Sequence, residues 1–113
     1  MGKTLGEFEQ MILLALIALG SDAYGASIRR EIVARTGREV SAGAVYTVLD
    51  RLERSAMVSS HIGEPTAERG GRRRKHYRIR PEAARLLAQT RERMRRMGSG
   101  LDDRLADLAL AED

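Results

Sequence analysis

The sequence SAGAVYTVLDRLERSAM at residues 41–57, followed by RGGRRRKHYRIR at residues 69–80, decides the fold of this chain. In the first stretch, apolar residues recur at the i, i+3, i+4 and i+7 spacing of an amphipathic helix, and Ser41 stands where an N-cap is expected. The second stretch holds seven Lys or Arg residues and no acidic residue, and it ends in strand-like alternation, with Tyr77 and Ile79 pointing inward. A helix followed by a basic hairpin predicts a winged helix-turn-helix, with double-stranded DNA as its partner.

Small and polar residues on this helix and basic residues on the hairpin are the expected DNA contacts. Small residues at the helix start let the backbone approach base edges, and the basic run can lie along phosphates. The alternative for both is a solvated surface, which we favour for Arg54. The expected DNA-contacting residues are Ser41, Ala42, Gly43, Tyr46, Thr47, Arg51, Arg72, Arg73, Arg74 and Lys75.

Two helices are predicted upstream. The first covers residues 5–19, ends at Gly20 and is apolar on nearly all sides, so it needs cover from a second subunit as well as from the core. The second has N-cap oxygens at Ser21 and Asp22 and an expected left-handed cap at Gly37. These helices complete a mainly α domain over residues 1–80.

A further helix begins at Pro81 and forms a separate C-terminal element over residues 81–113. Its apolar residues are spaced by sevens, and this phase continues across Gly98-Ser99-Gly100, where two glycines would cost a helix about 2 kcal/mol. The preserved phase favours one long helix with a weak point over two helices. Met94 and Met97 are expected to be core or coiled-coil residues, with an adaptable lining for an apolar effector as the alternative.

Composition agrees with a nucleic-acid-binding protein. The chain has 113 residues, a formal net charge of +4, a pI of about 10.1 and no cysteine. Its longest apolar run, residues 11–19, is too short to cross a bilayer, so we expect a cytoplasmic protein without a membrane partner.

Neither catalysis nor a bound cofactor is expected. His61 and His76 would face each other across the hairpin, but two histidines without a further ligand make a poor metal site. The chain contains no Gly-rich phosphate loop and no paired nucleophile and base, so the sequence does not predict an enzyme.

Three segments in this order and spacing resemble the PadR family of bacterial transcriptional regulators: YGASIRREI at 24–32, VSAGAVYTVLDRLERSAMV at 40–58 and RGGRRRKHYRI at 69–79. The resemblance runs from about Leu5 to Leu87, and the short length is similar to the subgroup with a single C-terminal helix. Ala56 stands where the family usually has glycine.

The resemblance implies a homodimer built by the first and C-terminal helices, with helix 41–54 in the major groove and the wing on the adjacent backbone. Two copies would read half-sites about one turn apart on a pseudo-palindromic operator. The family implies repression that a small molecule, bound at the dimer interface, relieves. The expected interface residues are Leu5, Phe8, Leu87, Met94, Met97, Leu101 and Leu108.

Two other functions use the same surface. A non-specific architectural protein would coat DNA without reading bases, and its affinity would fall steeply with salt. A winged helix can also serve as a protein-interaction module, although the arginine density of residues 69–80 disfavours a neutral partner.

Overall fold

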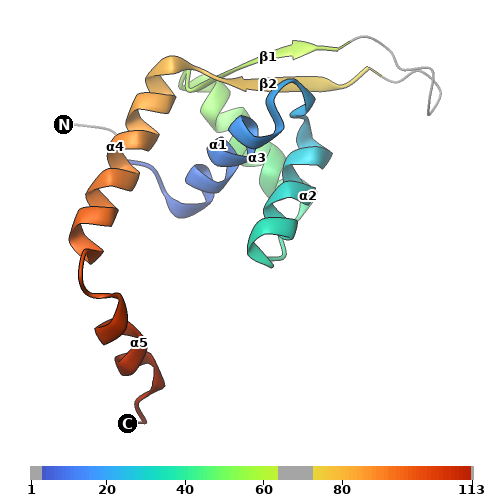
Figure 1. Cartoon of the computed structure of the whole chain (residues 1–113). Helices are drawn as coiled ribbons and strands as arrows, with labels where there is room; N and C mark the ends of the chain where they lie inside the picture. The colour runs from blue at the N-terminus through green and yellow to red at the C-terminus, as the bar shows by residue number, and fades with distance from the viewer. Residues whose placement is uncertain (1–3, 64–72, 113) are drawn as a thin grey trace.

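The computed structural model describes residues 4–63 and 73–112. A bundle of three helices lies under a two-stranded hairpin, and two further helices lead away from it (Figure 1). The predicted fold class, a winged helix-turn-helix followed by C-terminal helical structure, is confirmed. The elements are α1 (Glu7–Leu19), the 3-10 turn η1 (Gly20–Asp22), α2 (Gly25–Thr36), α3 (Ala42–Arg54), β1 (Val58–Ile62), β2 (Lys75–Ile79), α4 (Pro81–Gly98) and α5 (Asp102–Leu110).

The core forms where the apolar faces of α1, α2 and α3 meet under the hairpin. The four apolar residues that predicted α3 are all buried, as expected. Burial of each large aliphatic side chain contributes about 1.5–3 kcal/mol, which accounts for the cohesion of the bundle. The largest fully buried side chains are Ile12, Leu13, Ile28, Val45, Leu49 and Leu52.

The turn between α2 and α3 follows the predicted caps. Gly37 adopts φ 71°, and its N–H donates to the carbonyl of Val33. Ser41 then begins α3, with its Oγ accepting from the backbone N–H of Ala44 at 3.0 Å. Short-range chemistry therefore fixes the relative placement of the two helices.

The start of α2 differs from the prediction. Ser21 and Asp22 lie in η1 and do not cap α2, whose N-cap is Tyr24. The reason is that the chain first pairs with β2: the N–H of Tyr77 donates to the carbonyl of Ala23 at 2.9 Å. The hydroxyl of Ser27 then accepts from the Tyr24 N–H at 2.9 Å, which replaces the predicted cap.

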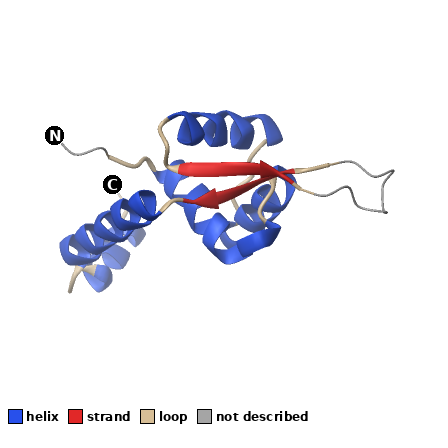
Figure 2. Cartoon of the chain, turned by 90° about the horizontal axis from the view of Figure 1, so that it is seen from above, coloured by secondary structure: helices blue, strands red, loops and turns tan. Residues whose placement is uncertain are grey.

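The hairpin is antiparallel, with Val58 opposite Ile79 and His61 opposite His76. Tyr77 and Val58 are buried against the helices, in agreement with the predicted alternation. Ile62 shares their face but is exposed at the end of β1. Seen from above, the two strands run side by side across the helices (Figure 2).

The turn after α3 holds Ala56 at φ 60°, the left-handed region that normally favours glycine. The N–H of Met57 donates to the carbonyl of Leu52 at 2.9 Å and leads the chain directly into β1. The tight turn thus forms with alanine at the left-handed position.

The expectation of one long C-terminal helix is wrong. The chain forms α4 and α5, separated by residues 99–101, with Gly100 at φ 78°. The two glycines disfavour a continuous helix at this point by about 2 kcal/mol, and the preserved heptad phase does not outweigh that cost. Among the described helices, none combines the length and apolar composition needed to cross a bilayer.

Candidate nucleic-acid interface

The outward face of α3 is a stripe of residues that lies opposite the buried positions. Gly43, Thr47, Asp50 and Arg54 recur every three or four residues and are all exposed. At the start of the helix, Ser41, Ala42 and Gly43 are exposed too, as predicted, and the space above Gly43 is open. This face has the width and the small leading residues of a helix that enters a major groove.

Tyr46 lies at the margin of that face and is half exposed. Its ring and hydroxyl sit directly over Gly25 of α2, where a Cβ atom would overlap them. The absence of a side chain at position 25 therefore leaves the room that the Tyr46 ring occupies.

Arg51 and Arg54 each lie beside a carboxylate. The Nε of Arg51 lies 3.8 Å from Oε2 of Glu9 on α1, which holds this side chain at the α1 edge of the face. Arg54 pairs with Asp50 at 2.9 Å in the middle of the face. Arg54 is exposed, and the solvated-surface interpretation favoured for it stays a prediction.

The base of the wing is tied to α3. Nζ of Lys75 lies 3.0 Å from Oε1 of Glu53, and the Ser60 hydroxyl donates to the same carboxylate. The hydrogen bond from Ser60 and then that from Lys75 lower the pKa of Glu53, and the bond to Glu53 raises the pKa of Lys75. Lys75, predicted to contact DNA, thus also fastens the hairpin to the helix.

The other wing residues of the prediction are placed as follows. Arg73 is exposed, and the guanidinium of Arg74 lies over the ring of Tyr24, 4.4 Å from its centroid. Arg72 lies outside the described residues. Arg30 of α2 donates to the Tyr24 hydroxyl at 3.0 Å, so α2 brings one more cationic residue to this side. Tyr24 and Arg30 were not among the residues predicted to contact DNA, although both lie in the segment YGASIRREI.

The residues predicted for a dimer interface fall into two groups. Leu5 and Leu87 are buried within this single chain, and Phe8 is half-buried under the guanidinium of Arg38. The remaining predicted residues are exposed on α4, α5 and the turn between them, together with Leu105, which the sequence analysis did not single out. These exposed residues are Met94, Met97, Leu101, Leu105 and Leu108.

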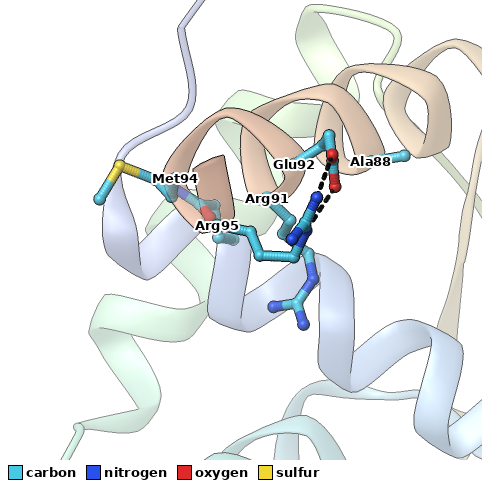
Figure 3. A pocket seen from close by; sticks show the side chains of 6 residues that line it. Ala88, Arg91, Glu92, Met94 and Arg95 are labelled. Carbon is cyan, nitrogen blue, oxygen red and sulfur yellow. Dashed lines mark hydrogen bonds and ion pairs between the residues drawn. The ribbon is translucent and has the colours of Figure 1, made fainter. Parts of the chain in front are cut away.

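A shallow cleft lies between α1 and α4 beside Met94 (Figure 3). Gln10 of α1 lines one side, and Arg91, Glu92 and Arg95 line the other. Arg95 pairs with Glu92 at 2.7 Å, and this hydrogen bond is the main cause of the lowered pKa of Glu92. The cleft therefore combines an apolar thioether with paired charges.

His61 and His76 stack across the hairpin with their centroids 5.4 Å apart, as the predicted register requires. Within residues 4–63 and 73–112, no group of three or more potential ligand side chains could hold a metal ion. The face of α3 and the basic hairpin beside it define the class: a winged-helix DNA-binding protein.

The chain belongs to the PadR-like family of transcriptional regulators, because the family model matches residues 13–89. This is a family of regulators and not of enzymes. No protein among the curated sequences matches the chain.

Solved structures share the fold. A transcriptional regulator from Clostridium thermocellum is 27% identical with a TM-score of 0.67, covering 84% of this chain and 89% of that one. A PadR family transcription regulator from Clostridium difficile is 24% identical with a TM-score of 0.66, covering 85% and 97%. A winged-helix DNA-binding protein from STIV is 17% identical with a TM-score of 0.67, covering 87% and 98%.

Proposed function

We propose that this PadR-like protein is a homodimeric, sequence-specific repressor that binds a pseudo-palindromic operator and is released by a small-molecule effector. In this proposal residues 1–80 bind DNA and residues 81–113 join the two copies. The observation that carries it is the exposed stripe of Gly43, Thr47, Asp50 and Arg54 beside a basic hairpin. Non-specific binding needs only positive charge, whereas this stripe presents a hydroxyl, a carboxylate and a guanidinium, which discriminate base edges.

The exposed apolar residues of the C-terminal helices support the homodimer. Met94, Met97, Leu101, Leu105 and Leu108 form an apolar stripe on elements that lead away from the three-helix body. Several large apolar side chains exposed on neighbouring helices are typical of an interface. Charge supports an antiparallel pairing of two copies, because arginines dominate residues 91–96 and aspartates dominate residues 102–107.

The cleft beside Met94 supports an effector at the same interface. It lies between α1 and α4, the helices expected to join two copies, and a polarisable thioether suits apolar ligands of varied shape. A molecule that fills this cleft would change the packing of α4 and so the separation of the two α3 helices.

Selection of the purified protein against random duplex DNA, at salt near physiological, tests the proposal. Recovery of a two-fold symmetric motif is the expected result. Binding that enriches no sequence and simply fades as salt rises would overturn sequence-specific regulation and leave an architectural protein. No binding to any duplex even at low salt would leave a protein-interaction module.

A further inference from the structure

We propose that Tyr24, Arg30 and Arg74 form a phosphate-binding site at the junction of α2 with the base of the wing, and that it holds one phosphodiester of the DNA backbone. The inference rests on the proposed DNA binding and names a contact that lies on neither the α3 face nor the outer wing.

The geometry of the site centres on one aromatic ring. The guanidinium of Arg74 stacks 4.4 Å from the Tyr24 centroid, and that of Arg30 lies 5.8 Å from the same centroid. Arg30 Nη2 also donates to the Tyr24 hydroxyl at 3.0 Å. One ring thus positions two guanidinium groups from segments far apart in sequence, and each keeps further N–H donors for a ligand.

The backbone under both arginines is held in place. Tyr24 pairs with His76 through a β-bridge, and their rings make an edge contact at 5.6 Å. On the wing side, the carbonyl of Arg74 accepts from the N–H of Gly63 at 2.8 Å. A site whose supporting segments are already fixed loses little conformational entropy when a ligand binds.

The charge at this junction is unbalanced. Arg35, Arg51 and Arg54 each lie beside a carboxylate, but neither Arg30 nor Arg74 pairs with one in the part of the chain that the structure describes. Both guanidinium groups lie within 5.8 Å of the same ring centroid, and a bound anion would accept charge-assisted hydrogen bonds from their free N–H donors. The oxygens of a phosphate suit the fork geometry of a guanidinium group.

The position of the site relative to α3 identifies the source of the phosphate. Arg30 lines a shallow hollow together with Arg29, Ser41, Ala42 and Tyr46 at the start of α3. A duplex whose major groove receives the start of α3 therefore brings its backbone past Arg30. The chemistry points to a phosphodiester of that same duplex, not to a free metabolite.

Arg30→Ala, Arg74→Ala and the double variant test the site, with Arg35→Ala as a charge-matched control from the same helix. We expect each single variant to bind about tenfold more weakly, on the selected duplex and on a scrambled one alike. The slope of log affinity against log salt should fall by about 0.9, one phosphate contact. The double variant should lose less than the product of the single losses because both arginines serve one phosphate.

Tyr24→Phe separates positioning from charge. It keeps the stacking ring and removes the hydroxyl that holds Arg30, so affinity should fall by less than in Arg30→Ala while the salt slope stays that of the wild type. Arg35→Ala should bind as the wild type does, and thermal melts should show every variant folded.

The site would be disproved if Arg30→Ala and Arg74→Ala kept the affinity and salt slope of the wild type. If the wild type still selected a symmetric motif, the proposed function would stand. Equal losses in Arg35→Ala would also overturn it, because general charge would then explain the effect. Failure of the wild type to bind any duplex would overturn the proposed function itself.

Discussion

Ala56 occupies a backbone conformation that disfavours a side chain, at φ 60°. We expect Ala56→Gly to raise the free energy of unfolding by about 0.5–1 kcal/mol, because relief of the left-handed strain outweighs the added chain entropy. Urea unfolding measures the change. Ala34→Gly, at an exposed position within α2, is the control and should lower the free energy of unfolding by about 1 kcal/mol. If both glycines destabilised the chain alike, the strain at Ala56 would be disproved.

Arg51 tests whether α3 reads bases. We expect Arg51→Ala to weaken operator binding by about 1–3 kcal/mol and to relax the selected motif at one position in each half-site. Its contact with Glu9 holds the guanidinium at the edge of the face, so the loss should be confined to that position. Arg104→Ala on α5 removes the same charge elsewhere and should leave the motif intact. Uniform weakening on all sequences would show that Arg51 contacts only phosphate.

Helix caps and buried strand positions were predictable because they depend on residues close together in the sequence. Gly37, Ser41 and Tyr77 follow from cap chemistry and strand alternation, and the structure bears them out. The association of Tyr24 with Arg74 was not predictable, because it depends on how a segment before α2 meets the wing. Pairing with β2 also displaced the cap predicted at Ser21 and Asp22.

At the scale of elements, Glu53 joins α3 to the wing through Ser60 and Lys75. The folded pKa of Glu53 lies below its ordinary value of 4.5, so its bonds stabilise the fold above that pH and are lost as pH falls through the folded pKa. The folded pKa of Lys75 lies above 10.5, so its contribution is present below that pH and is lost as pH rises through the folded pKa.

We therefore expect Glu53→Gln to lower the melting temperature near neutral pH and to converge with the wild type in acid. Thermal melts of both proteins over the acid range measure this difference. Glu39→Gln, at an exposed carboxylate in the turn between α2 and α3, is the control. A difference between Glu53→Gln and wild type that stays constant down to strongly acid pH would contradict the ionic link.

The existence and order of α1 to α4 and of the two strands were predictable from periodicity, since each of them carries a clear pattern. The break between α4 and α5 was not predictable from the heptad spacing. That spacing shows which residues would lie on one face of a helix, but not whether the helix is continuous. Gly98 and Gly100 break the helix locally, and Gly100 has a positive φ, which a right-handed helix does not contain.

At the scale of the whole molecule, the apolar stripe of α5 tests the homodimer. We expect Leu105→Asp to convert the protein into a monomer, because a buried carboxylate without a partner costs several kcal/mol. Leu110→Asp places the same substitution on the opposite side of α5, away from Leu101 and Leu108, and should leave the assembly intact. Sedimentation velocity measures both. Two equally dimeric variants would exclude α5 from the interface.

Gly25 and Gly43 lie near the exposed face of α3 and differ in the space available for a side chain. Gly25 lies under Tyr46, and any side chain there would push the tyrosine aside, whereas the space above Gly43 is open. If α3 reads bases as proposed, substitutions at position 43 can change the preferred operator without steric cost to the fold, whereas a side chain at position 25 would displace Tyr46. Directed evolution of this regulator toward new promoters would begin from residues 43, 47, 50 and 54, with Gly25 held constant.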